Sequence, residues 1–435
     1  MANKKFSEFT LKTDSANVDF VVGYDGTDNV RIAPSNLSSG GASALDGLSD
    51  CDTTDSGQGS MFIGNVPAGL TTSAYYNTGL GYSSLNSLTT ANYNTSVGRN
   101  SLKLLTASEG HNTAFGADAL NAGSSTQQYS TAIGSGAGYS ATGRHAVYVG
   151  YQSGRNNTNQ GHISIGYQAG YSQTSGSRNT NLGYKSGYTH TSNSNITNLG
   201  YESGILNTGA GTTNVGSQAG YGLTGGNNTT LGYRAGYKDG LSQSGSYNVY
   251  VGSLCAYNSS GSASNNTAIG GRAMQDVSTG SNNTCIGRSA GESITTGSNN
   301  TVIGYDAEPS AVDATNEITL GDANIATLRC QVQTISALSD SRDKTNVQPS
   351  TYGLDFINKL NPVTFDWDMR DGAKVGDKDL GFIAQELQEV DDENLQLVYA
   401  NNPDRLEASY GRLIPVLVKA IQELKLELDN CKNCK

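Results

Sequence analysis

The chain contains few of the large apolar residues from which the cores of globular proteins are built. Its 435 residues include only 7 Pro, 8 Phe, 4 Met and 1 Trp, and hydrophobic residues make up 35% of the total. No run of 18 apolar residues occurs, so the sequence predicts no helix that spans a membrane. A single large hydrophobic core is not expected from this composition.

Positive charge is also scarce. Charged residues make up 15% of the chain, the formal net charge is −11 and the pI is about 4.8. No basic surface for nucleic acid is therefore expected. The first residues contain two lysines with no apolar stretch behind them, which predicts no secretory signal and synthesis in a cytoplasm.

Metal-ligating residues are few and scattered. Four of the six cysteines are isolated, and only Cys431 and Cys434 form a C-x-x-C pair, with no second pair to complete a zinc site. Free thiols in a terminal tail, or cross-links between subunits, are the alternatives for this pair. No H-x-H pair occurs, and no metal or cofactor is expected; the histidines are His111, His145, His162 and His190.

Glycine and tyrosine are abundant instead, at 55 and 24 residues, and the glycines mark an internal repeat. The unit reads N-T-x-[I/V/L]-G, as in NTSVG from Asn94, NTNLG from Asn179 and NTAIG from Asn266. We call the glycine of this motif the key glycine. It recurs fifteen times, 16 to 20 residues apart, at Gly64, Gly81, Gly98, Gly116, Gly134, Gly150, Gly166, Gly183, Gly200, Gly216, Gly232, Gly252, Gly270, Gly287 and Gly304.

A unit of about 17 residues predicts one coil of a β-solenoid. It is too short for two helices and a turn, but it can hold two short strands and two turns. Glycine suits a tight turn with positive φ, and the recurring Asn predicts a ladder of stacked amides. We expect the small residue three positions after the key glycine to face inward, as at Ala137, Ser153, Ala169 and Ser186. We expect the same of the aliphatic residue before it, as at Ile133, Val149, Ile165, Leu182, Leu199 and Leu231.

These repeats resemble the head repeats of trimeric bacterial adhesins, whose units also carry I-G and A-G pairs. The resemblance covers roughly residues 61–310. It implies a left-handed parallel β-roll in which three chains lie side by side.

The remaining sequence divides into four further parts around this shaft at 61–310. Residues 1–37 contain two apolar runs around Asp25-Gly26, a hairpin signal. This segment resembles the N-terminal region by which some phage fibres attach to the tail, which implies a tail or baseplate protein as partner. Residues 38–60, rich in Ser, Gly and Asp, predict a linker. Residues 311–338 predict a short β collar, and 339–435 differ from all of these.

Three blocks follow one another after residue 338. They are SDSRDK from Ser339, GLDFINKLNPVTFDWD from Gly353, and GFIAQELQEV from Gly381. Together they resemble the peptidase S74 intramolecular chaperone of phage tailspikes and fibres. This resemblance implies a domain at 339–435 that trimerises the fibre and, in many members, then cuts itself off.

Carried onto this sequence, the resemblance places cleavage at Leu338–Ser339. It makes Ser339 the nucleophile and Lys344 the general base, with Asp340 and Arg342 in support. A serine hydroxyl needs a base to become a nucleophile. A lysine serves only if burial or a nearby cation such as Arg342 disfavours its charge.

Two observations keep other interpretations of this segment open. Asp343 directly precedes Lys344, and a carboxylate beside a lysine favours the charged amine, which argues against its acting as a base. Ser339 or Asp340 could instead be the N-cap of a helix, with Lys344 solvated. Gln385 and Glu386 lie in the third block, with no role assigned.

The C-terminal segment carries an apolar seam at alternating spacings of three and four residues. Such a seam predicts a short coiled coil. The alternative is an amphipathic helix that packs on its own domain. The seam residues are Ile414, Leu417, Ile421, Leu424 and Leu428.

Tyrosines recur after the key glycine and after the second glycine of the unit, which predicts two outward aromatic ladders. They could stack on a host polysaccharide or stabilise one another. The first set is Tyr151, Tyr167, Tyr184, Tyr201 and Tyr233, and the second is Tyr139, Tyr171, Tyr188, Tyr221 and Tyr237.

The sequence thus predicts a mainly β, elongated trimeric fibre. It has a parallel β-roll or β-helix shaft and a C-terminal α+β chaperone domain that ends in a helical coiled coil. The expected function is that of a phage tail fibre in the virion, a homotrimer that binds a glycan or protein receptor on the host cell. No nucleic acid, no membrane insertion and no enzymatic activity beyond self-cleavage are expected.

Two alternatives remain. A polysaccharide-degrading tailspike needs two carboxylates around the sugar bond, and acidic residues within 61–310 are sparse without a suggestive cluster. A cellular trimeric adhesin needs a signal peptide and a membrane anchor, which the sequence does not display.

Overall fold

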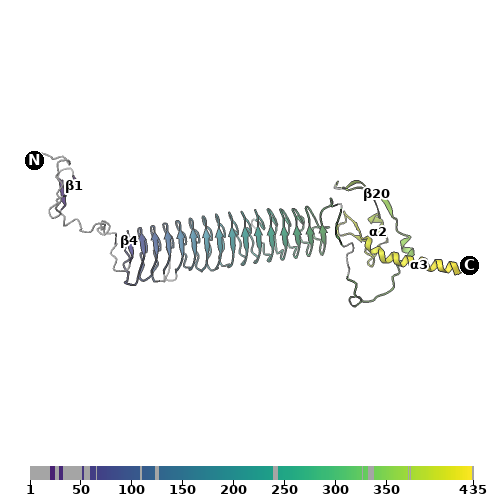
Figure 1. Cartoon of the computed structure of the whole chain (residues 1–435), viewed down its shortest axis with the longest axis horizontal. Helices are drawn as coiled ribbons and strands as arrows, with labels where there is room; N and C mark the ends of the chain where they lie inside the picture. Colours follow the sequence, from purple (N-terminus) through teal and green to yellow (C-terminus); the bar gives the residue numbers. More distant parts are fainter. Residues whose placement is uncertain are drawn as a thin grey trace. The chain divides into compact units, whose positions relative to one another are not determined.

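The structure is a computed structural model that describes residues 20–24, 29–32, 51–52, 59–64, 66–107, 110–122, 127–238, 243–325, 327–331, 338–370, 372 and 374–433. It divides into two units, the first up to Ser194 and the second from Asn195. Each unit contains a stack of parallel β-solenoid coils (Figure 1). The fold is mainly β, as predicted.

Every coil contributes one three-residue strand that ends directly before a glycine. In the first unit these strands are β4 (Met61–Ile63), β5 (Thr78–Leu80), β6 (Thr95–Val97), β7 (Thr113–Phe115), β8 (Thr131–Ile133), β9 (Val147–Val149), β10 (Ile163–Ile165) and β11 (Thr180–Leu182). In the second unit they are β12 (Thr197–Leu199), β13 (Thr213–Val215), β14 (Thr229–Leu231), β15 (Val249–Val251), β16 (Thr267–Ile269), β17 (Thr284–Ile286), β18 (Thr301–Ile303) and β19 (Ile318–Leu320).

Neighbouring strands pair in parallel with equivalent residues opposite each other. In the pair β16–β17, for example, Thr267 lies opposite Thr284 and Ile269 lies opposite Ile286. The same register holds for β7–β8, where Phe115 lies opposite Ile133. Each repeat therefore stacks its own sequence positions on those of the next repeat, as a solenoid requires.

The strands show that one expectation about the interior is wrong. The aliphatic residue before the key glycine faces outward, and Ile133, Leu182 and Leu231 are 43%, 39% and 46% exposed. The middle residue of the strand is the buried one, as at Ala132 and Ala268. Successive side chains of a strand point to opposite faces, so only one of three can enter a narrow coil. The other residues concerned, Val149, Ile165 and Leu199, are half-buried or exposed as well.

Two other expectations about the interior are confirmed. Ala137, Ser153, Ala169 and Ser186 are fully buried. The asparagine ladder is also present, because Asn283 Nδ2 donates to Asn266 Oδ1 at 3.2 Å and its backbone N–H donates to the same oxygen at 2.9 Å.

The interior of the coils changes from apolar to polar along each stack. Apolar clusters lie around Leu102 and Leu120 in the first unit and around Met274 and Ile294 in the second. Coils nearer the unit boundary bury polar groups instead, such as His162 in the first unit and Asn214 in the second. Buried polar groups need partners, and those of the ladder find them on neighbouring coils.

The C-terminal part of the second unit is a small α+β domain. A hairpin of β20 (Val363–Asp368) and β21 (Val375–Gly381) and a short pair of β22 (Val398–Tyr399) and β23 (Glu407–Ala408) accompany three α-helices. These are α1 (Leu354–Ile357), α2 (Ala384–Val390) and α3 (Leu413–Asn433). Their apolar residues form one cluster, which includes Phe356, Leu387, Leu395, Leu397, Leu413 and Val416.

The flanking segments are described in part. In residues 1–37, β1 (Phe20–Tyr24) and β2 (Asn29–Ile32) pair as the predicted hairpin, whose turn lies outside the described residues. Within the predicted linker 38–60, β3 (Cys51–Asp52) pairs antiparallel with β4. Within the predicted collar 311–338, β19 continues the parallel stack on β18. The four boundaries between the five predicted parts stay predictions.

Candidate functional site

The serine and lysine predicted for self-cleavage lie in contact. Lys344 Nζ is 2.6 Å from Ser339 Oγ and 3.2 Å from the carbonyl oxygen of the same residue. A single turn of 3-10 helix, η3 (Ser341–Asp343), brings them together across five residues. The amine is therefore placed where a base must lie to accept the serine proton.

Asp340 and Arg342 form a separate pair beside this contact. Asp340 is the N-cap of η3, and its Oδ1 accepts from the backbone N–H of Arg342 at 2.9 Å. The Arg342 guanidinium also donates to both oxygens of Asp340, which holds the pKa of that carboxyl below its usual range. The cation that was expected to act on Lys344 is thus engaged by Asp340. Asp340 is thus the N-cap, as one of the alternatives for this segment predicted. The Ser339–Lys344 contact is present at the same time.

The segment is open to solvent in one chain. Leu338 is fully exposed, and Ser339 and Lys344 are exposed as well. None of the ion pairs among the described residues joins Asp343 to Lys344. The geometry of a serine–lysine dyad is present, but the burial that would disfavour a charged lysine is not provided by the described part of a single chain.

The second and third sequence blocks lie in the α+β domain that follows this segment. Trp367 Nε1 donates to Asp379 Oδ2 across the β20–β21 hairpin at 3.1 Å, and Lys374 Nζ lies 4.8 Å from the indole centroid. Glu386 accepts from Asn361 Nδ2 at 3.0 Å. Gln385 lines a groove of about 840 Å³ beside the hairpin. No hydrogen bond or ion pair in the described part of the chain joins Gln385 or Glu386 to Ser339 or Lys344.

Helix α3 carries two apolar faces. One face, with Leu413, Val416 and Ala420, is buried against its own domain. The predicted seam is a different face and remains uncovered; Ile414, Leu417, Ile421, Leu424 and Leu428 are 45% to 66% exposed. The two alternatives for this helix therefore coexist, because packing on the domain leaves the seam free for a partner.

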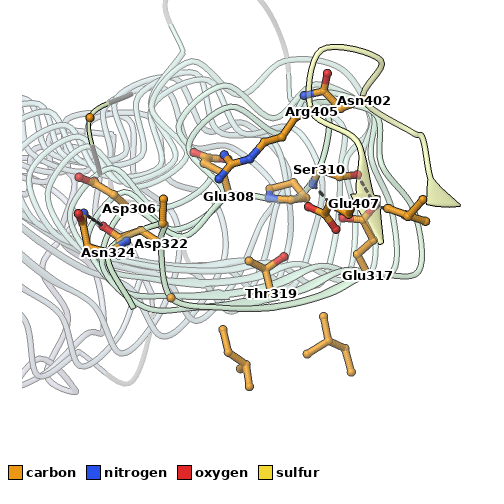
Figure 2. Close-up of a pocket in the computed structure, with 17 residues that line it drawn as sticks. Asp306, Glu308, Ser310, Glu317, Thr319, Asp322, Asn324, Asn402, Arg405 and Glu407 are labelled. Atoms are coloured by element: carbon orange, nitrogen blue, oxygen red, sulfur yellow. Dashed lines mark hydrogen bonds between the residues drawn. The ribbon is translucent and has the colours of Figure 1, made fainter. Parts of the chain in front are cut away.

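A groove of about 850 Å³ lies where the last solenoid coil meets the C-terminal domain (Figure 2). Its lining includes five carboxylates and one cation among the described residues, namely Asp306, Glu308, Glu317, Asp322, Glu407 and Arg405. The sequence did not predict this cluster, because it combines residues of the shaft, the collar and the chaperone segment. It is the first place where a sugar-cleaving carboxylate pair would be sought.

The best-placed carboxylates of this groove are engaged in structural contacts. Glu308 accepts from the backbone N–H and the hydroxyl of Ser293, and burial raises the pKa of its carboxyl. Glu317 accepts from Ser310, Tyr399 and Asn401. Partial burial acts to raise the pKa of Glu317, but these hydrogen bonds outweigh it and lower the pKa. Glu317 thus ties the last coil to the loop around β22.

The predicted tyrosine ladders are present. In the first set, the rings of Tyr151 and Tyr167 stack at 5.3 Å and those of Tyr167 and Tyr184 at 5.2 Å. In the second set, Tyr171 and Tyr188 stack at 5.1 Å. Stacked rings cover part of each other's faces, which are the surfaces that a sugar would need. The geometry favours mutual stabilisation.

A third aromatic ladder was missed. It consists of Tyr76, Tyr93, His111, Tyr129 and His145, with neighbouring centroids 4.6 to 5.3 Å apart. Each of these residues directly precedes the ladder position that Asn occupies in most repeats, and each has positive φ. The constant offset from that position was the signal that could have revealed the ladder.

Comparison with known families supports the C-terminal assignment. Residues 339–396 match the family model of the peptidase S74 domain, described as chaperone of endosialidase, so the match begins at the predicted nucleophile. Domains of this family are autoproteolytic intramolecular chaperones that mediate trimerisation and are typical of tailspike-like phage fibres. No curated protein and no solved structure shows a significant match to the chain.

Membrane-spanning helices and metal-binding clusters are both absent from the described residues. No helix among them is both long and apolar enough to cross a membrane. No group of three His, Cys, Asp or Glu side chains within the described ranges could hold a metal ion. Cys431 is an exposed free thiol, and Cys434, the other cysteine of the C-x-x-C pair, lies outside those ranges.

Proposed function

We propose that the chain is a phage tail fibre, a structural and receptor-binding homotrimer of the virion. The observation that carries this proposal is the S74 domain directly behind a long β-solenoid. The solenoid supplies length and the domain supplies the means to assemble three repetitive chains in register. Residues 1–37 attach the fibre to a tail or baseplate protein, and the shaft or its tip contacts a glycan or protein on the host cell.

A repetitive shaft needs such an assembly domain for a physical reason. Because every coil presents nearly the same strand, neighbouring registers differ little in energy, and chains could pair with a shift of one or more coils. A trimerising domain at one end sets the starting register before the shafts associate. The uncovered seam of α3 supports this role, since an apolar a/d row on a helix is stabilised by a partner helix.

The proposal includes one self-cleavage step at Leu338–Ser339. Lys344 Nζ takes the proton of Ser339 Oγ, which attacks the carbonyl carbon of Leu338. The bond from that carbon to the Ser339 nitrogen breaks, the nitrogen is protonated, and an ester between Leu338 and Ser339 Oγ remains. Water then hydrolyses the ester, which leaves Leu338 with a free carboxylate.

Assembly would provide what the single chain lacks at this site. Lys344 is exposed in one chain, and a lysine becomes a base only when burial or a nearby cation disfavours its charge. A neighbouring subunit that covers the segment would supply that burial. Cleavage is therefore expected to follow trimerisation.

The test is the intact mass of the purified full chain together with its molar mass by light scattering. We expect a trimer of chains that end at Leu338, and a released fragment that begins at Ser339. Ser339→Ala and Lys344→Met should remain trimeric but uncut. The control Ser341→Ala, at the first residue of η3, should be cut normally. An uncut wild-type trimer would refute cleavage alone, and a monomer would refute the fibre.

A further inference from the structure

An unbroken row of apolar side chains follows the outer surface of the coils. Every strand from β4 to β19 ends in Ile, Val, Leu or Phe, and this last residue is exposed or half-buried in each coil. We call these residues the outer row. In the first unit it runs through Ile63, Leu80, Val97, Phe115, Ile133, Val149, Ile165 and Leu182, and in the second through Leu199, Val215, Leu231, Val251, Ile269, Ile286, Ile303 and Leu320.

The row is continuous within each unit because the coils stack in register. Ile269, Ile286 and Ile303 lie opposite one another on β16, β17 and β18, and each is 39% to 40% exposed. Neighbouring strands are about 4.8 Å apart, so these side chains lie close together and form one stripe. Isolated exposed apolar residues are normal on a protein, whereas a contiguous stripe of this kind marks a surface that associates.

The other outward position of the strand is different in character. It is Thr in most coils, as at Thr267 and Thr284, and the hydroxyl of this residue can hydrogen-bond to water. A strand with one solvated face should alternate apolar inside and polar outside. Here the interior position is often small or polar, as at Ala268 or Asn181, while the aliphatic residue is outside. The pattern is that of a strand whose second face is also covered.

The partner must repeat with the same spacing as the row. A surface without repeats cannot present an apolar group to each of eight consecutive coils about 4.8 Å apart. A glycan is also a poor match, since the row consists of hydrocarbon side chains that offer no hydrogen bonds. A second copy of this chain in the same direction matches the spacing coil by coil.

We propose that the outer row is the surface through which the shafts of neighbouring subunits pack, with equivalent coils of each chain at one level and their rows facing a common axis. This inference rests on the proposed trimer and specifies which side of the shaft it buries. It assigns the most regular apolar position of the repeat to contacts between chains. The exposed seam of α3 is the corresponding surface on the C-terminal domain.

The test is whether a cross-linker joins neighbouring subunits through a cysteine placed at one residue of the outer row. In full-length protein with Cys51, Cys330, Cys431 and Cys434 changed to Ser, Leu182→Cys is treated with a short bis-maleimide. The control is Thr191→Cys, which is exposed and lies nine residues, about half a coil, further along the chain. Light scattering before the reaction gives the oligomeric state of each variant.

We expect both variants to be trimers, with covalent dimers on a denaturing gel for Leu182→Cys and single chains for Thr191→Cys. A trimer without cross-links at Leu182, or with equal cross-linking at Thr191, would overturn the assignment of the row and leave the trimer standing. A monomer would overturn both.

As a second measurement, Leu182→Asp should lower the thermal midpoint of the shaft, whereas Thr191→Asp should leave it unchanged. Equal midpoints for the two variants would contradict the proposal.

Discussion

The key glycine of each coil combines a left-handed backbone with close contact to the next coil. At Gly270 φ is +145°, and an added Cβ would lie 2.1 Å from the carbonyl oxygen of Gly287. That oxygen belongs to the backbone of the neighbouring coil, so it cannot move aside as a flexible side chain could. The neighbouring Gly271 has no such restriction, because its Cβ would find only the carbonyl oxygen of Ser253, at 3.7 Å.

We therefore predict opposite outcomes for two adjacent substitutions. Gly270→Ala should destabilise the shaft by about 3 kcal/mol or more, since it adds both backbone strain and a clash with the next coil. Gly271→Ala should change the free energy of unfolding by less than about 1 kcal/mol. Thermal or denaturant unfolding of the two variants checks this, and similar losses for both would contradict the stacking argument.

At the scale of the element, the asparagine ladder is interrupted in several coils, and in one of them by a buried histidine. His162 occupies the ladder position of its coil, where its Nε2 lies 2.8 Å from the carbonyl oxygen of Gly176. Asn179, one coil further on, makes the equivalent bond with its Nδ2 to the carbonyl oxygen of Asn193. Burial lowers the pKa of His162 to about 4, although the bond to Gly176 acts in the opposite direction.

This pKa predicts that the coil loses stability in acid. The folded protein keeps His162 neutral down to about pH 4, whereas the unfolded chain binds the proton near pH 6.5. Stability is unaffected above about pH 6.5 and falls as the pH drops toward 4, by up to about 3 kcal/mol. His162→Asn restores the ladder residue and should remove this part of the acid sensitivity.

The measurement is the thermal midpoint of the shaft between about pH 7 and pH 4 for both proteins. The exposed His145 supplies the control, since His145→Asn should leave the acid sensitivity as it is. If His162→Asn has the same pH profile as the unchanged protein, burial of this imidazole is not what makes the shaft acid-sensitive.

At the scale of the whole molecule, one face of α3 is buried in its own domain and the other is available for the proposed trimer. Leu413 and Val416 belong to the core of the C-terminal domain, whereas Ile421 and Leu424 are 66% and 54% exposed. A charge on the exposed face should not disturb the domain, because no part of the chain that the structure describes covers that face. It should instead disrupt the contact between helices of different subunits.

We predict that Ile421→Glu combined with Leu424→Glu converts the trimer largely to monomers while the far-ultraviolet circular dichroism of the domain is kept. Gln422→Glu, on an exposed position between them, adds one negative charge outside the seam, against two in the double variant, and should leave the trimer intact. Light scattering distinguishes the outcomes. A double variant that remains trimeric would show that the seam does not hold the subunits together.

Much of the architecture was predictable from sequence because the same residue types recur at the same position of many coils. The parallel solenoid, the asparagine ladder, the buried small residues and the stacked tyrosines all follow from positions that recur every coil. The pairing of Ser339 with Lys344 came from the S74 resemblance, and the structure places the two side chains in contact. The roles of these residues in cleavage stay predictions.

The sequence by itself thus determined the period, the class of fold and the assignment of the C-terminal domain. Only the tertiary structure decided which side of each strand faces the interior, and it placed residues such as Ile133 and Leu182 outside. The physical reason is that alternation in a three-residue strand separates two faces without saying which one is the core. Apolar character predicts burial, but it does not distinguish burial within a chain from burial between chains. Likewise, the contact of Glu317 with Tyr399 joins residues far apart in sequence, and the fold alone brings them together.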